Sequence, residues 1–416
     1  MVPGRDELAN SPQGLSTLMR EWQLRWSALV PQLPAQLWLL AVAAFVNFLG
    51  FMVTPFLVLY LTQVAAFPVE VAGVLLTCFG IGGILGAWTG GRLSDRIGAP
   101  NVLVLSFLVS AGAMSIIPLL SNVVLIGGTL VVLAFATGAF RPAYDACVVN
   151  LCPEEERSRA YGVYVVAINV GAGIAAAIGG YLYGIEPSLI FYADALSSLL
   201  AAGLVFFSLD RHLKPSHVTV SDRAPDRPTL AAHRSVAFLI VCLASCVLDV
   251  VSKQTSATFP LYVSSAYGMR PEAFGNLLTV GYIAFAAAVM PVSGWVKKQN
   301  QTRMAVIGMC IVAAAFALLP LGSGIAMLVC LYLLITMGQL LFYPAIMSIV
   351  MGEAARNGGR SGEYMGFYRT AQSVAGVAAP SIGTLIYAQI SPAALWFFCA
   401  TLTLLSSAAL WRRRVS

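Results

Sequence analysis

Two charged side chains of opposite sign lie four residues apart within a long apolar stretch of this sequence. Asp249 and Lys253 belong to residues 236–262, where most other side chains are apolar or small. Residues at this spacing share one face of an α-helix, so the two charges can pair. A carboxylate in such surroundings can also alternate between its charged and neutral forms. We therefore expect either a structural ion pair or a proton-coupling site.

Arg141 and Asp145 repeat this spacing in a second apolar stretch, residues 123–149, and have the same two interpretations. Other polar side chains in apolar stretches are candidates for binding a solute in a substrate cavity. They are Asn47, Gln254, Gln339 and Tyr343. No catalytic residue is expected, because intramembrane catalysis needs a metal-ligand or nucleophile–base cluster and we find neither.

The composition places all of these residues in a membrane protein. Of 416 residues, 59% are hydrophobic and 10% are charged, whereas soluble domains have about 25% charged residues. A soluble enzyme is therefore excluded. One crossing of the bilayer needs roughly 20 helical residues, and the apolar stretches supply twelve such segments. They are residues 37–60, 69–89, 102–120, 123–149, 161–182, 189–208, 236–262, 274–296, 304–321, 324–350, 364–387 and 393–410.

Positively charged loops indicate how these segments are oriented. Twenty of the 24 lysine and arginine residues precede the first segment, follow the last, or lie in loops on the same side of the membrane. Such residues accumulate in cytoplasmic loops, so both termini are predicted to be cytoplasmic, with the protein in the cell inner membrane. The expected domains are a cytoplasmic N-terminal segment (1–34), a six-helix bundle (35–208), a cytoplasmic linker (209–234), a second six-helix bundle (235–411) and a cytoplasmic tail (412–416).

The sequence also limits the partners. All three histidines lie in the polar linker and the eight cysteines lie in or beside apolar segments, so no metal site and no cofactor are expected. No Gly-rich Lys motif for nucleotide phosphates is present, which excludes ATP as the energy source. The net charge of +6 is scattered over short loops, which does not indicate nucleic-acid binding. We expect a monomer in a lipid bilayer that binds a small-molecule substrate and protons.

The two six-helix bundles are related by an internal repeat. Glu70–Thr77 and Glu272–Thr279 share Glu, Gly, Leu-Leu and Thr at matching positions, an offset of 202 residues, and Pro142 and Pro344 repeat at the same offset. A duplicated six-helix unit is the architecture of many secondary transporters. The two glutamates follow prolines at predicted helix starts, where we expect them to cap the positive helix ends rather than carry protons.

A short polar motif joins the second and third segments. It reads Gly90-Gly-Arg-Leu-Ser-Asp-Arg-Ile-Gly98, and we expect a tight turn on the cytoplasmic side. The motif resembles the loop between helices 2 and 3 of the major facilitator superfamily, although Ala99 and Pro100 follow where that family has basic residues. The resemblance implies a cytoplasmic gate formed by Gly91, Asp95, Arg96 and Gly98. In that gate Asp95 lies against the start of helix 11, and Asp145 can join the same charge cluster instead of coupling protons.

The fifth segment carries a second resemblance. Asn169-x-Gly171 and Gly179-Gly180 are similar to the glycine-rich pattern of drug:proton antiporters in this superfamily, with Ala175 and Ala176 in place of its Gly-Pro. The resemblance implies an all-α polytopic membrane fold of twelve helices in two pseudo-repeats, with helices 1, 4, 7 and 10 lining a central cavity.

For function, the resemblance implies a secondary active transporter that works by alternating access. It would be a multidrug antiporter whose activity is proton-coupled efflux of small amphipathic organic compounds. One alternative is a transporter of a defined metabolite such as a siderophore or organic acid. The other is a membrane sensor that transports nothing.

Overall fold

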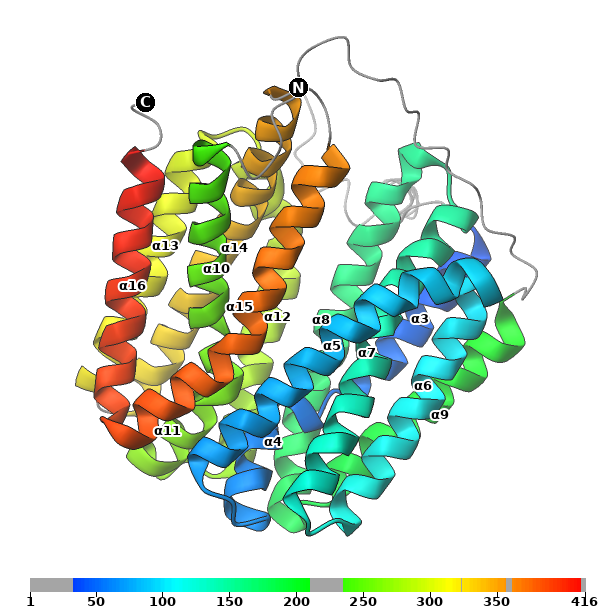
Figure 1. The fold of residues 1–416 in the computed structure, drawn as a ribbon, viewed down its shortest axis with the longest axis horizontal. Helices are drawn as coiled ribbons and strands as arrows, with labels where there is room; N and C mark the ends of the chain where they lie inside the picture. The colour runs from blue at the N-terminus through cyan, green and yellow to red at the C-terminus, as the bar shows by residue number, and fades with distance from the viewer. Residues whose placement is uncertain (1–32, 210–234, 323, 357–360, 413–416) are drawn as a thin grey trace, which may run out of the picture.

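The computed structural model describes residues 33–209, 235–322, 324–356 and 361–412, which form helices and no strand. Twelve membrane segments follow one another in chain order (Figure 1). Eleven are long and apolar enough to cross a membrane, and the remaining one, α15, is 29 residues long but more polar.

The elements are α3 (Ala35–Leu49), α4 (Val53–Leu59), the π-helix η1 (Tyr60–Val64), α5 (Val69–Ile97), α6 (Ala99–Ile116), the 3₁₀ turn η2 (Ile117–Leu119), α7 (Val123–Leu151), α8 (Glu154–Ile185), α9 (Leu189–Ser208), α10 (Val236–Ala257), α11 (Phe259–Tyr267), α12 (Pro271–Val296), α13 (Gln301–Leu318), the 3₁₀ turn η4 (Leu319–Leu321), α14 (Ile325–Arg356), α15 (Ser361–Gln389) and α16 (Pro392–Arg412).

The all-α polytopic fold expected from the sequence is therefore confirmed. Residues 1–32, 210–234 and 413–416 lie outside the described residues, so the predicted cytoplasmic N-terminal segment, linker and tail stay predictions.

Helix α5 corrects the prediction of a tight turn over Gly90–Gly98. The helix continues to Ile97, and only Gly98 leaves it, with φ 87° and ψ 140°, a conformation that favours glycine. Within the last turns, Ser94 Oγ donates to the Gly90 carbonyl (2.8 Å) and the Arg92 guanidinium lies 3.8 Å from the centre of the Trp88 ring. Polarity alone was misleading here, because a helix can extend beyond the bilayer with its backbone fully hydrogen-bonded.

The first membrane segment corrects a second prediction. A single helix was expected over residues 37–60, but the helix is interrupted at residues 50–52, between α3 and α4. A Cβ at Gly50 would overlap the Ser197 side chain of α9, so this close approach requires glycine. The Asp194 carboxylate, also from α9, lies within hydrogen-bonding range of the backbone N–H groups of Met52 and Val53. Backbone groups freed inside a membrane need such partners, because no water is available.

Helices α3–α9 form one half of the molecule and α10–α16 form the other (Figure 1). We call the side where α3 begins and α16 ends the terminal face, and the other side the opposite face. Six hydrogen bonds join the halves among the described residues, and all lie near the opposite face. Figure 1 shows α5 and α15 coming together in the lower part of the view and separating toward the terminal face.

The internal sequence repeat lies at this contact between the halves. Thr77 of α5 donates to the Val377 carbonyl of α15 (3.1 Å), and Thr279 of α12 donates to the Gly173 carbonyl of α8 (2.7 Å). The repeated segments therefore make equivalent contacts, each with the fifth helix of the other half.

The repeated glutamates also lie at this contact. Glu70 and Glu272 occupy the first turns of α5 and α12, as the sequence predicted. Glu70 Oε1 accepts from Gln389 Nε2 (2.6 Å), and Glu272 packs against Gly184. Both acids thus face the other half of the molecule, a contact that a helix cap does not require.

Glycines at every fourth position bring α5 against α7 within the first half. A Cβ at Gly90 would lie 2.7 Å from the Ala139 Cα, and a Cβ at Gly82 would lie 3.0 Å from the Val131 Cα. At Gly86 the added carbon would overlap the Phe135 carbonyl. Small residues allow this backbone approach in membranes, where close packing rather than the hydrophobic effect drives helix association.

Candidate functional site

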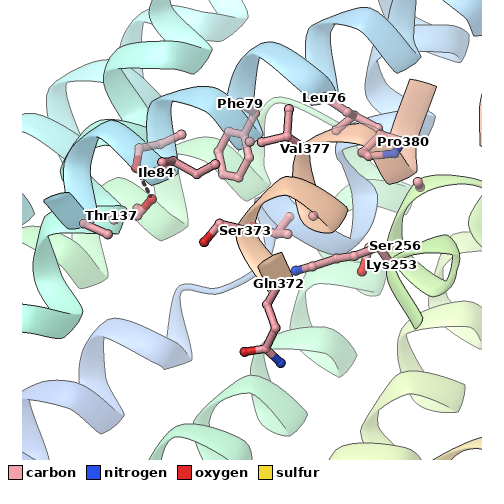
Figure 2. Close-up of a pocket in the computed structure, with 18 of the residues that line it drawn as sticks. Leu76, Phe79, Ile84, Thr137, Lys253, Ser256, Gln372, Ser373, Val377 and Pro380 are labelled. Carbon is pink, nitrogen blue, oxygen red and sulfur yellow. Dashed lines mark hydrogen bonds between the residues drawn. The ribbon is translucent and has the colours of Figure 1, made fainter. Parts of the chain in front are cut away.

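A cavity of about 460 Å³ lies between the two halves. It is bounded by α4, α5 and α7 on one side and by α10 and α15 on the other (Figure 2). The wall from α4 and α5 is largely apolar, whereas α10 and α15 supply the polar groups Lys253, Ser256, Arg369, Gln372 and Ser373. A cavity with this mixture of surfaces suits a ligand that has one apolar part and one polar part.

The helices that line the cavity differ in part from those implied by the resemblance. The first, fourth and seventh segments contribute through α4, α7 and α10, but the tenth segment, α14, supplies none of the described lining residues. The second and eleventh segments, α5 and α15, take its place. Their lining positions include Gly83 and Gly376, which leave space between the halves because they have no side chain, and Gly80, which lets α5 approach the backbone of Val377.

The contacts between the halves indicate which end of the cavity is closed. Near the opposite face, α5 and α15 are joined from Gly73 to Gly80, where a Cβ would lie 3.2 Å from the Val377 Cα. Helices α8 and α12 pack together along more of their length, as far as Gly162 and Met290. Toward the terminal face, no hydrogen bond or ion pair joins α5 to the part of α15 that the structure describes. This structure is therefore closed at the opposite face.

Asp249 and Lys253 do not form the ion pair that their spacing predicted. Among the described residues the only ion pair joins Arg356 and Glu353 (3.4 Å). The Asp249 carboxylate instead accepts from the Tyr343 hydroxyl of α14 (2.9 Å) and, at 3.5 Å, from Ser245 Oγ. Tyr343 binds the carboxylate in place of Lys253 because its hydroxyl approaches directly from another helix. Lys253, four residues further along the same helix, would have to give up its extended side-chain conformation to reach the carboxylate.

The Lys253 side chain extends from α10 toward α15 in Figure 2, and its Cε comes within 4.0 Å of a Cβ built at Gly376. It lines the cavity, whereas Asp249 does not. The two candidates for proton coupling thus lie in different surroundings, one hydrogen-bonded between helices and one open to the cavity.

A polar network surrounds the Asp249 carboxylate. Ser245 Oγ also lies 3.1 Å from the Tyr368 hydroxyl, so its one proton can be donated either to Asp249 or to Tyr368. The Tyr368 hydroxyl accepts in addition from Gln372 Nε2 (3.1 Å). Because Gln372 lines the cavity, this network connects Asp249 with the cavity wall.

The four residues predicted to line a substrate cavity instead form hydrogen bonds between helices. Gln339 Nε2 donates to Ser252 Oγ (3.0 Å), and Tyr343 binds Asp249, so both join α14 to α10. Gln254 is 1% exposed and donates to the Ala379 carbonyl of α15 (2.8 Å). Asn47 Nδ2 donates to Ser198 Oγ of α9 (3.3 Å). None of the four is among the described lining residues, because polar groups in a membrane helix are equally well used to bind a neighbouring helix.

Arg141 and Asp145 also fall short of ion-pair distance. Asp145 is half-buried and lies within hydrogen-bonding range of the Tyr161 hydroxyl of α8, with the charges of Arg141 and Arg369 nearby. Arg141 is exposed one turn beyond Thr137, which lines the cavity. These side chains therefore lie between the cavity and the terminal face.

The predicted gate residues are not engaged with α15 in this structure. Asp95 and Arg96 are exposed at the end of α5, and neither has a hydrogen bond or ion pair among the described residues. The predicted approach of Asp95 to the start of helix 11 is therefore absent here. The absence is consistent with the separation of α5 and α15 toward the terminal face.

Sequence reasoning missed the three polar residues that α15 presents to the cavity. Arg369, Gln372 and Ser373 lie within four positions and so within about one helical turn. Arg369 NH1 donates to Gln372 Oε1 (3.1 Å). The available signal was an arginine inside an apolar segment, which usually marks a pathway or a buried pair.

A family model for the Major Facilitator Superfamily matches residues 40–376. The chain belongs to this superfamily. The uncharacterized MFS-type transporter YttB of Bacillus subtilis (strain 168) is 25% identical over 380 residues, which cover 90% of this chain and 94% of YttB. Multidrug resistance protein 2 of the same organism is 23% identical over 326 residues, covering 76% of this chain and 79% of that protein. A crystal structure of a variant of the peptide transporter POT matches with a TM-score of 0.74 and 16% identity, covering 91% of this chain and 94% of that one.

Membership of the Major Facilitator Superfamily makes this protein a transporter of small molecules and not an enzyme. It also argues against the alternative of a sensor that transports nothing. The fold of POT supports the architecture of two six-helix halves, and at this identity it supports nothing beyond the fold.

Proposed function

We propose that the protein is a proton-coupled exporter of small amphipathic organic compounds that works by alternating access. The observation that carries the proposal is a cavity between the two halves, closed at the opposite face, with a carboxylate network in one of its walls. A relative named as a multidrug resistance protein supports this class of substrate.

The positively charged loops support a cytoplasmic location for the terminal face, and we propose that the protein acts as a monomer in the cell inner membrane. In this orientation the structure is closed toward the outside. A compound would then enter the cavity from the cytoplasm and leave after the halves have rearranged.

Asp249 is the proposed proton carrier. A carboxylate in a membrane helix is costly when charged, and hydrogen bonds from Tyr343 and Ser245 stabilise the charged form. Movement of α14 relative to α10 would remove the Tyr343 bond and favour protonation. Proton uptake at Asp249 would in this way be linked to the packing of the second half.

The polar end of α5 is the proposed gate of the terminal face. When α5 and α15 approach there, Asp95 would meet the positive N-terminal end of α15, a favourable position for a carboxylate. Gly91, Arg96 and Gly98 belong to the same gate. In the present structure Asp95 is exposed, as the open stage of such a cycle requires.

The test is transport in proteoliposomes with and without a pH gradient, using an anionic and a cationic amphipathic dye, carboxyfluorescein and tetramethylrhodamine methyl ester. We expect the wild-type protein to accumulate a dye against its gradient only when the pH gradient is imposed. Asp249→Asn should lose this accumulation and keep downhill exchange, because its side chain cannot alternate between charged and neutral forms.

Lys298→Gln serves as the control, since Lys298 is exposed outside the cavity. It should transport as the wild-type protein does. Full uphill transport by Asp249→Asn would rule out Asp249 as the proton carrier, and transport of both dyes that ignores the pH gradient would rule out proton coupling.

A further inference from the structure

Resting on the proposed export function, we infer that the transported compound carries an anionic group, such as a carboxylate or sulfonate, which binds between Lys253 and Arg369. The two side chains come from different helices, α10 and α15, and both line the cavity. None of the described lining residues is acidic. The lining therefore has two positive charges and no negative one.

Neither cation forms an ion pair with a described residue. Lys253 has no hydrogen bond or ion pair among these residues, and Arg369 donates only to the neutral amide of Gln372. Charged groups within membrane helices are costly and usually have a functional reason. An anion held between the two side chains would offset much of that cost.

The acids nearest these cations are already bound elsewhere. Asp249 accepts from Tyr343 and Ser245 and does not line the cavity. Asp145 lies nearer the terminal face and interacts with Tyr161 and with the charges of Arg141 and Arg369. Three positive side chains, those of Lys253, Arg369 and Arg141, therefore face the two acids, which leaves the region with an excess of one positive charge.

The rest of the cavity determines what else the compound must have. The wall opposite the cations contains Leu57, Leu76, Phe79 and Ile84, with Val377 beside them. These side chains favour a flat or branched apolar body over a sugar or a peptide backbone. An organic acid with one apolar side thus fits the cavity better than a lipophilic cation.

Binding can be measured without any gradient. Purified protein in detergent is titrated with carboxyfluorescein and with tetramethylrhodamine methyl ester, which share a xanthene core and differ in charge, and fluorescence polarisation is recorded. We expect the anionic dye to bind the wild-type protein at least about tenfold more tightly, and Lys253→Gln and Arg369→Gln each to weaken it about tenfold. Lys298→Gln should bind both dyes as the wild-type protein does.

Charge reversal gives the sharpest comparison. A protein with both Lys253→Glu and Arg369→Glu should prefer the cationic dye. Equal binding of the two dyes by the wild-type protein, or an unchanged preference after the double reversal, would overturn the inference.

A second measurement does not depend on either dye fitting the cavity. Ser373→Cys places a thiol in the cavity and Ser121→Cys places one in an exposed loop at the opposite face. Both are treated with an anionic and a cationic methanethiosulfonate, and each labelled site is quantified by mass spectrometry. The ratio of anionic to cationic labelling should be about tenfold higher at position 373 and should fall in Lys253→Gln, because the local potential concentrates anions. Equal ratios at the two sites would also overturn the inference.

These results separate the inference from the proposed function. A preference for anions together with transport that ignores the pH gradient would contradict proton coupling alone. Proton-driven transport with no charge preference would contradict the anionic substrate alone.

Discussion

Asp194 is 4% exposed and lies against the break between α3 and α4. Its carboxylate faces the backbone N–H groups of Met52 and Val53. The Met52 N–H also donates to the Gly50 carbonyl within the break, so the role of Asp194 is greatest at Val53. No water can replace it inside a bilayer. A single side chain from α9 thus permits the interruption of the first membrane segment.

This role predicts different results for two substitutions of similar size. Asp194→Asn keeps an oxygen that can accept a hydrogen bond, so we expect near wild-type thermal stability. Asp194→Leu removes the side-chain acceptor that faces the Val53 N–H, and we expect a loss of about 1–3 kcal/mol. Thermal unfolding of the purified variants, followed by intrinsic fluorescence, measures the difference. Equal stability of the two variants would show that the carboxylate does not support the break.

At the scale of single elements, α5 has a stability role on one face and a functional role on another. Its glycines at positions 82, 86 and 90 allow contact with α7, Gly80 allows contact with α15, and Gly83 leaves space for the cavity. Gly91 belongs to the same helix, yet a Cβ there would meet nothing within 4 Å. The sequence alone does not show which glycines allow helix contact, which leave space for the cavity and which have no close neighbour.

The same substitution at two of these positions should therefore have opposite effects. Gly86→Ala would push α5 away from Phe135, and we expect it to destabilise the protein by about 1–3 kcal/mol. Gly91→Ala meets no neighbour and should stabilise the helix by about 0.4–1 kcal/mol. Melting temperatures of the purified proteins provide the comparison, and a stable Gly86→Ala protein would contradict the packing described for α5 and α7.

At the scale of the whole molecule, transport by alternating access requires the halves to separate at the opposite face. Thr77 of α5 and Ser381 of α15 lie at this contact, with their hydroxyl oxygens 2.6 Å apart. Side chains this close suit a disulfide if both are replaced by cysteine. A cross-link here should hold the protein in the conformation described.

We expect Thr77→Cys with Ser381→Cys, made in a Cys78→Ser background, to lose transport on oxidation and to regain it on reduction. Cys78 is removed because it is a free cysteine and directly follows Thr77 in the chain. Each single cysteine variant should transport normally under both conditions. Dye transport in proteoliposomes provides the measurement. Normal transport by the fully cross-linked protein would mean that these helices need not separate.

The membrane segments, their order and the relation between the two halves follow from the sequence alone. Inside a bilayer backbone groups without a water partner must be satisfied by the protein, so long apolar stretches become helices, whereas the break at residues 50–52 depends on a neighbouring helix. The repeated Glu70–Thr77 and Glu272–Thr279 likewise predicted two equivalent halves, and both segments lie at the contact between them.

Only the tertiary structure decided what each polar side chain contacts. Spacing shows that Asp249 and Lys253 share a helix face, but it cannot show that Tyr343 of α14 reaches the carboxylate first. The sequence made Gln254 a plausible cavity residue, but the packing of α15 against α10 buries it in a hydrogen bond to Ala379. The position of α15 also brings Arg369 to the cavity, which the sequence did not predict. Helical periodicity determines which residues point the same way, whereas the packing of distant segments determines whether that direction is another helix, lipid or a cavity.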